Sequence, residues 1–312
     1  MIEAIDFIEH NLKEDITVAD IAAAVSYSLY HFCRTFNKVT HHTPYDYLIR
    51  RRLSESAQEL VRSGKKIIDV AFEYQFNSPE TYSRAFKRMF GVQPRRWRKQ
   101  AHIGRRSLMP RLTGEHLEHI GKGDYLKAVL EEKHAFQVAG VMTLVRDDRR
   151  VILQLWDTLA QELEGMGITR HQNGRSEKLM ECHQNGCSQK PKGCHQNGRS
   201  EKLMAGCYYG IAHYPKGWQE RGYLYLAAVE AESLDVSGSA LVVRTVASSR
   251  YARFIHKGSF RDIGLTLDYV YQTWLPKSGQ HIAGPFEIEC YGQNFGFPDD
   301  DESETTIYIP IK

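Results

Sequence analysis

The sequence has few cysteines, no long apolar run and no basic start, and each of these absences argues against one class of protein. Six cysteines in 312 residues do not suggest a disulfide framework. No stretch of about 18 apolar residues occurs, so no membrane span is expected. The first ten residues include three acidic residues and no lysine or arginine, unlike a signal peptide. We therefore expect a cytoplasmic protein with no membrane partner.

Common catalytic motifs are also missing. The chain has no phosphate-binding loop, no nucleophile elbow and no His-Glu-x-x-His metal site. We expect no enzyme and no cofactor. A length of 312 residues with 42% hydrophobic content is enough for two domains, each with its own core.

Acidic residues are absent from residues 84–106, which hold nine lysines and arginines. Residues 1–106 contain 18 basic against 12 acidic residues, whereas the remainder contains 23 against 26. A basic N-terminal part joined to a mildly acidic remainder favours nucleic-acid binding by one domain. The alternative is a set of amphipathic helices whose basic face is merely solvated.

The first hundred residues contain the same unit twice. Residues 20–36 read DIAAAVSYSLYHFCRTF and residues 69–86 read DVAFEYQFNSPETYSRAF. The two copies align at an offset of 49 before the turn and 50 after it, so one residue has been added in the second turn. The matched pairs after the turn are Phe32 and Tyr82, Arg34 and Arg84, Phe36 and Phe86, Pro44 and Pro94, and Tyr47 and Trp97. A repeat of this length indicates two copies of one structural unit.

Each copy predicts a helix, a tight turn and a second helix. Thr17, Ser28 and Ser78 are candidate N-caps, and Pro79 suits the first helical position. The residues expected to face inward are Val18, Ile21, Ala22, Val25, Leu29, Phe32 and Phe36 in the first unit, and Ile67, Ile68, Ala71, Tyr82, Phe86 and Phe90 in the second. A long helix from Pro44, with Val61 among its buried residues, would hold the two units at a fixed spacing.

The outward faces of the second helices carry polar and basic side chains. Residues near the start of a helix that enters a major groove reach base edges, and arginine suits guanine. Lys87, Arg88, Arg96 and Arg98 are better placed for phosphates, which position the protein without reading sequence. Two such helices held on one long helix could enter successive major grooves, about 34 Å apart.

The segment FNSPETYSRAFKRMFGVQPRRWR resembles the signature of the AraC/XylS family of transcriptional regulators, and the resemblance covers roughly residues 1–105. It implies an all-α DNA-binding domain of two helix-turn-helix units joined by a long helix, over residues 1–106, which binds double-stranded promoter DNA. By position it implies base contacts from Tyr30, Cys33, Arg34, Glu80, Thr81 and Arg84. It also implies activation through contact with RNA polymerase.

Strand patterns begin after residue 131. We expect a strand at 134–145, a helix at 149–164, a hairpin at 207–214 and 223–232, a strand segment at 239–258, a helix at 262–275, and strands at 286–292 and 305–312. This order predicts an α+β domain of duplicated strand-helix-strand-strand halves over residues 131–312, with a groove between the halves. Residues 107–130 are interpreted as a linker.

The motifs RYARFIHKGSF, LDYVYQTWLPKSG and GPFEIECYG resemble the GyrI-like effector-binding domain. The resemblance implies a small-molecule effector that meets a glutamate, which corresponds to Glu289. Tyr291 follows on the same face of the strand, and Trp218, Tyr209 and Tyr225 are candidate aromatic walls. One carboxylate among aromatic rings suits a lipophilic cation or an aromatic compound. Ordinary core packing is the alternative for each aromatic residue.

Residues 169–206 form an insert in which HQNG recurs every 12 residues. Its low apolar content and Asn-Gly turns suggest a protruding loop. His171, His183, His195 and the nearby cysteines lack the short Cys-x-x-Cys spacing of zinc sites, so no metal site is predicted.

The sequence therefore predicts a DNA-binding transcriptional regulator whose C-terminal groove takes an effector, and the family resemblance implies an activator. Two alternatives stay open. One is a GyrI-like hydrolase of small molecules, and the other is a protein that sequesters drugs and no longer needs its DNA contacts.

Overall fold

The computed structural model describes residues 1–100, 108–122, 126–146, 150–168, 207–215, 222–232, 234–292, 294–295 and 300–312. The predicted insert at 169–206 lies outside the described residues, as does Trp218. Within the described residues, no helix is both long and apolar enough to span a bilayer.

The N-terminal part is entirely helical, as predicted. Its helices are α1 (Ile2–His10), α2 (Val18–Ala24), α3 (Leu29–Thr40), α4 (Pro44–Arg62), α5 (Ile67–Glu73), α6 (Pro79–Phe90) and α7 (Pro94–Gln100). The predicted caps are present: the side chains of Thr17, Ser28 and Ser78 each accept a hydrogen bond from the backbone N–H three residues on. The residues that cap the C-terminal ends of α3 and α6, His41 and Gly91, both adopt the left-handed conformation.

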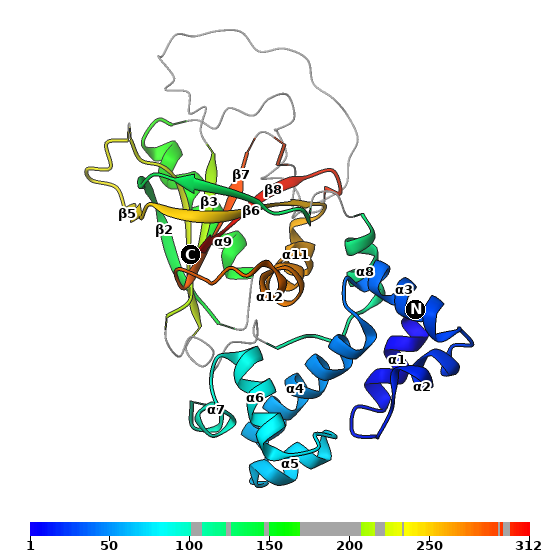
Figure 1. Cartoon of the computed structure of the whole chain (residues 1–312). Helices are drawn as coiled ribbons and strands as arrows, with labels where there is room; N and C mark the ends of the chain where they lie inside the picture. The colour runs from blue at the N-terminus through cyan, green and yellow to red at the C-terminus, as the bar shows by residue number, and fades with distance from the viewer. Residues whose placement is uncertain are drawn as a thin grey trace.

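Helix α4 connects two separate cores (Figure 1). Tyr47 and Leu48, near its start, pack with α1, α2 and α3, whereas Leu53, Ala57 and Leu60 pack with α5, α6 and α7. At a rise of 1.5 Å per residue its 19 residues span about 28 Å. The two helix-turn-helix units therefore sit on one continuous helix, as the sequence predicted.

Three apolar residues predicted to face inward do not. Leu29 is 50% exposed, Ile68 43% and Val61 42%. All three lie at a helix end: Leu29 is the first residue of α3, Ile68 the second of α5 and Val61 the last but one of α4. The other predicted core residues of α3 and α6, Phe32, Phe36, Tyr82, Phe86 and Phe90, are buried.

The segment predicted as a linker is partly structured. It contains helix α8 (Gly114–Gly121), which packs against both α3 and α11, and the start of strand β1 (Val129–Lys133). The predicted boundary at residue 131 therefore falls inside β1. Sequence periodicity missed α8 because only two of its eight residues, His119 and Ile120, are buried, which leaves little apolar repeat to detect.

The C-terminal part is an α+β domain built on one antiparallel sheet. Its strands are β1, β2 (Phe136–Val145), β3 (Tyr208–His213), β4 (Tyr223–Glu230), β5 (Val242–Val246), β6 (Ser249–Lys257), β7 (Phe286–Tyr291) and β8 (Glu304–Ile311). Their order is β1-β6-β8-β7-β3-β4-β2-β5. The predicted single segment at 239–258 is two strands, β5 and β6, which are not neighbours in the sheet.

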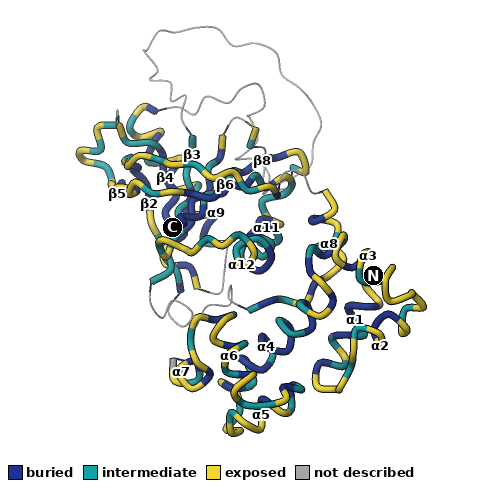
Figure 2. Tube along the Cα trace, viewed as in Figure 1, coloured by how far each residue is buried: buried dark blue, intermediate teal, exposed yellow. Residues whose placement is uncertain are grey.

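The helices of this domain, α9 and the α11–α12 segment, lie on the same face of the sheet (Figures 1 and 2). Helix α9 (Arg150–Gly165) packs its leucines on β2, β3 and β4. Helix α11 (Ile263–Tyr269), which follows the short turn η3 (Phe260–Asp262), continues through a π-helical segment η4 (Val270–Trp274) into α12 (Leu275–Ser278). The α11–η4 region packs on β6 and β8. The opposite face has its own core, in which residues of β6 meet residues of β2 and β5, so the sheet is curled.

Candidate functional site

The exposed faces of α3 and α6 carry the predicted base-reading residues. Tyr30 is 76% exposed. Arg34, Glu80, Thr81 and Arg84 are exposed and Cys33 is half-buried. Four aromatic residues of the same helices, Phe32, Phe36, Tyr82 and Phe86, are completely buried, so core packing accounts for them and leaves the other face to solvent.

The basic residues predicted for phosphate contact separate into two groups. Lys87, Arg88 and Arg96 are exposed. Arg98, in contrast, donates from Nε to the carbonyl of Leu60 at 3.0 Å and from a terminal nitrogen to that of Lys65 at 2.6 Å. It holds the end of α4, so its assignment to phosphates is not supported by the geometry.

The C-terminal end of α3 contacts the second domain. His41 Nδ1 lies 2.9 Å from the Tyr269 hydroxyl, and the Lys277 ammonium donates to the His41 carbonyl. His42 Nε2 lies 3.0 Å from the Thr273 hydroxyl while its Nδ1 lies 2.9 Å from the Asp46 carboxylate. Burial lowers the pKa of His42, although the hydrogen bond to Asp46 opposes that effect. A neutral His42 donates from Nδ1 to Asp46 and accepts from Thr273.

A second set of contacts fixes α8 between the domains. His119 Nε2 lies 2.7 Å from the Thr266 hydroxyl of α11, which lies 2.8 Å from His256 Nδ1 of β6. Burial, assisted by the nearby His256, lowers the pKa of His119 to about 4. Arg51 of α4 donates to the carbonyl of Met109 at 2.6 Å, which ties the segment before α8 to the helical part.

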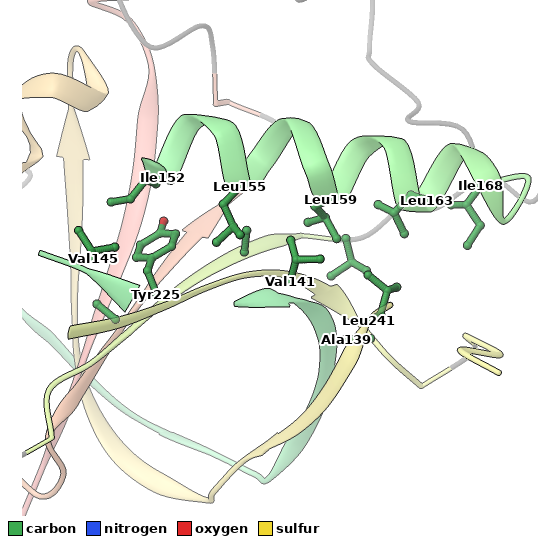
Figure 3. Close-up of a cluster of buried hydrophobic side chains, with 13 residues drawn as sticks. Ala139, Val141, Val145, Ile152, Leu155, Leu159, Leu163, Ile168, Tyr225 and Leu241 are labelled. Atoms are coloured by element: carbon green, nitrogen blue, oxygen red, sulfur yellow. The ribbon is translucent and has the colours of Figure 1, made fainter. Parts of the chain in front are cut away.

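Glu289 lies on the helix-covered face of the sheet, with only 5% of its surface exposed. Its Oε2 accepts hydrogen bonds from the hydroxyls of Tyr225, at 2.8 Å, and Tyr291, at 2.6 Å. Burial, reinforced by the charge of Glu289, raises the pKa of both tyrosines, which therefore stay protonated as donors. The predicted trio of Glu289, Tyr225 and Tyr291 is brought together. Figure 3 shows Tyr225 rising from the sheet toward α9.

One of the two other predicted wall residues, Tyr209, does not lie beside Glu289. Tyr209 pairs with Cys290, so it points to the opposite face, where it packs on Phe136 with ring centroids 5.3 Å apart. Trp218 lies outside the described residues. An unpredicted ring, Trp156 of α9, stands 5.3 Å from the ring of Tyr291 and nearly perpendicular to it.

Gly210 of β3 makes room for the Tyr225 hydroxyl. A Cβ at this position would lie 2.1 Å from that hydroxyl and 2.8 Å from Glu289 Oε2. We expect Gly210→Ala to displace Tyr225 from Glu289 and to cost about 1–3 kcal/mol, which differential scanning calorimetry would measure. Gly264→Ala, in α11 with no atom within 4 Å of the added Cβ, is the matched control. Equal stability of the two variants would contradict this view of the site.

Sequence reasoning missed a second buried carboxylate. Glu287 is 1% exposed and accepts hydrogen bonds from the hydroxyls of Tyr214, at 2.7 Å, and Tyr271, at 3.1 Å. Its i, i+2 spacing from Glu289 was the available signal, because alternate strand residues share a face. Among the described residues, no cluster of histidine, cysteine and acidic side chains has the arrangement of a metal site.

Comparison with known proteins finds a family model for each of the two parts of the chain. Residues 21–100 match the model of a helix-turn-helix domain, and residues 128–312 match the GyrI-like small molecule binding domain. The TetD protein of transposon Tn10 from Escherichia coli is 39% identical over 93 residues, covering 30% of this chain and 67% of TetD. The transcriptional regulator Rob of Salmonella typhimurium is 34% identical over 106 residues, covering 34% of this chain but only 37% of Rob.

Among solved structures, SAV2435 bound to tetraphenylphosphonium matches with 16% identity, over 60% of this chain and 94% of that chain, at a TM-score of 0.39. The fold and the matches together define a DNA-binding protein with a small-molecule-binding domain. The chain belongs to the GyrI-like family and carries an AraC-type helix-turn-helix domain, and it is an AraC-family transcriptional regulator. AraC-type regulators are a non-enzymatic family, as the sequence analysis expected.

Proposed function

We propose that this regulator reads a promoter with both helix-turn-helix units and that an effector in the C-terminal domain changes its affinity for that DNA. The observation that carries the proposal is the pair of exposed recognition helices, α3 and α6, fixed on one 19-residue helix. One chain then presents two helix-turn-helix units, here called the first and second reading heads, without dimerising.

Base contacts are assigned to the exposed faces of these helices. Arg34 and Arg84 occupy equivalent places, 50 residues apart, and each suits a guanine. Tyr30 and Cys33 lie beside the first arginine, and Glu80 and Thr81 beside the second. Lys87, Arg88 and Arg96 serve phosphates. Activation through contact with RNA polymerase is the mode of action that the AraC-type relationship suggests.

The effector is assigned to the cluster around Glu289. A buried carboxylate with tyrosine donors and the Trp156 ring nearby favours a cation with aromatic or apolar substituents, since ion pairing and cation–π contact act together. Because Glu289 is 5% exposed, such a ligand must displace part of the cover over the sheet.

Contacts link Glu287, which neighbours Glu289 on the same face of β7, to the first helix-turn-helix unit. Tyr271, which donates to Glu287, lies in the π-helical segment η4 between Tyr269 and Thr273, the two residues that contact His41 and His42. Isolated π-helical turns often occur at functional sites. A change in the hydrogen bonds around Glu287 would therefore move the residues that hold the end of α3.

We expect His41→Gly to weaken this coupling while preserving DNA binding. The variant removes the side chain that contacts Tyr269 and places at φ 58° a residue that tolerates this angle, as Gly91 does in the second unit. DNA affinity would be measured by fluorescence anisotropy with and without tetraphenylphosphonium, an aromatic monocation. Wild type should show a shift of about 1–3 kcal/mol, and the variant a clearly smaller one.

His10→Ala, at an exposed histidine of α1, is the control and should keep the full shift. A ligand-dependent shift of equal size in His41→Gly and wild type would contradict this coupling. A wild type that binds the cation without any change in DNA affinity would contradict the proposed regulation itself.

A further inference from the structure

Two cysteines from neighbouring strands share one face of the sheet. In the ladder between β3 and β7, Tyr209 pairs with Cys290, and alternate residues of a strand lie on the same face. Cys207 lies two residues before that tyrosine and therefore on the same face as Cys290, away from Glu289. Continuing the register places Cys207 opposite Gly292, which has no side chain to separate the two thiols.

The two thiols are in contact. Burial raises the pKa of Cys290 to about 12, and Cys207 adds to that shift by its charge and through a hydrogen bond between the thiols. Both side chains are half-buried free thiols. A disulfide needs Cα atoms within about 7 Å of each other. Cys207 directly precedes the paired residues of β3, so its backbone can shift to meet this requirement without breaking the ladder.

We propose that Cys207 and Cys290 form a reversible disulfide by exchange with a low-molecular-weight disulfide. The Cys207 thiolate attacks the small disulfide, forms a mixed disulfide with one half and releases the other half as a thiolate. The Cys290 thiol then gives up its proton, and its sulfur attacks the Cys207 sulfur and displaces the second small thiol. Two protein thiols are oxidised and one small disulfide is reduced to two thiols, so the electrons balance.

The chemistry of the two thiols sets the order of attack. Only a thiolate is a nucleophile, and the Cys290 thiol is protonated at neutral pH, so Cys207 attacks first. In the second step Cys290 is held against its target, and this proximity compensates for its small thiolate fraction. The new bond ties β3 to β7 one residue from Glu289. Its formation does not depend on the proposed effector, but it would link thiol oxidation to the strand that carries the effector carboxylate.

The test uses tryptic peptides that contain one cysteine each. Residues 203–216 form one peptide, with Cys207, and residues 278–312 form another, with Cys290. The folded full chain is treated with glutathione disulfide, its remaining thiols are blocked with iodoacetamide, and the digest is read by mass spectrometry without reductant. The two peptides should appear joined, and dithiothreitol should separate them.

Two variants test the order of attack. Cys290→Ser should stop the reaction after the first step, so that Cys207 accumulates as a mixed disulfide with glutathione. Cys207→Ser should leave Cys290 as a free thiol. Both variants should lose the joined peptides. Cys33 is the internal control in every sample, since its peptide, residues 14–34, should join neither of the other two.

Three results would overturn the proposal. In the first, the peptide 203–216 joins one that carries Cys182, Cys187 or Cys194 in place of Cys290. In the second, both peptides keep free thiols at a glutathione disulfide concentration that oxidises the chain unfolded in guanidinium. In the third, the joined pair forms equally in the folded and the unfolded chain, which would mean that the fold does not bring the thiols together. These results come from the wild-type chain, so they decide the proposal even where a variant does not fold.

Discussion

The double variant Arg34→Ala/Arg84→Ala is expected to lose sequence-specific DNA binding. Each arginine lies on the exposed face of its recognition helix, and a bidentate contact to guanine is worth about 1–3 kcal/mol of discrimination. Together the substitutions should cost about 2–6 kcal/mol, which brings binding close to that of random DNA. Fluorescence anisotropy with a duplex selected from a random pool by the wild-type chain would measure this loss.

The control is Lys87→Ala/Arg88→Ala on α6. Both side chains are assigned to phosphates, so the variant should bind all duplexes more weakly and lower the salt slope by about one for each lost contact. Specificity for the selected duplex should remain. Undiminished preference for that duplex in the arginine variant would show that other residues read the bases.

Phe86→Ala is expected to unfold the second reading head. The side chain is completely buried, with its ring centroid 4.5 Å from that of Phe90, 5.4 Å from Tyr82 and 5.5 Å from Trp97. Removing a phenyl group from such a cluster costs about 3–5 kcal/mol, a large part of the stability of a small domain. Calorimetry should show a much lower melting temperature for the helical part.

Phe72→Ala provides the matched control, because Phe72 is 50% exposed in the neighbouring helix α5. It should change the free energy of unfolding by no more than about 1 kcal/mol. Similar losses in the two variants would mean that the aromatic cluster of α6 and α7 is not the core of this head.

The helix-turn-helix units and the strand that carries Glu289 were predictable, because in both the local sequence pattern agrees with the observed packing. The offset of 49 and then 50 residues identified two helix-turn-helix units, and Ser28, Ser78 and Pro79 marked where the recognition helices begin. Strand alternation likewise placed Glu289 and Tyr291 on one face. These features depend only on residues close together in the chain.

The missed features depend on long-range contacts. The sequence does not show that His41 meets Tyr269, 228 residues away, or that Tyr271 reaches Glu287. Tyr209 was predicted to line the Glu289 site, but it pairs with Cys290, one residue away from Glu289, and its side chain therefore lies on the other face. Arg98 belongs to a basic run and yet caps the carbonyls at the end of α4.

The central claim is that one chain reads a specific DNA site and that a ligand of the GyrI-like domain changes this binding. The most direct measurement is an anisotropy titration of the full chain with its selected duplex, against random competitor, at two salt concentrations, with and without tetraphenylphosphonium. We predict tight binding that survives the competitor, a salt slope of several phosphate contacts and an affinity that tetraphenylphosphonium shifts. Binding fully lost to random competitor, or unaltered by saturating tetraphenylphosphonium, would contradict the claim.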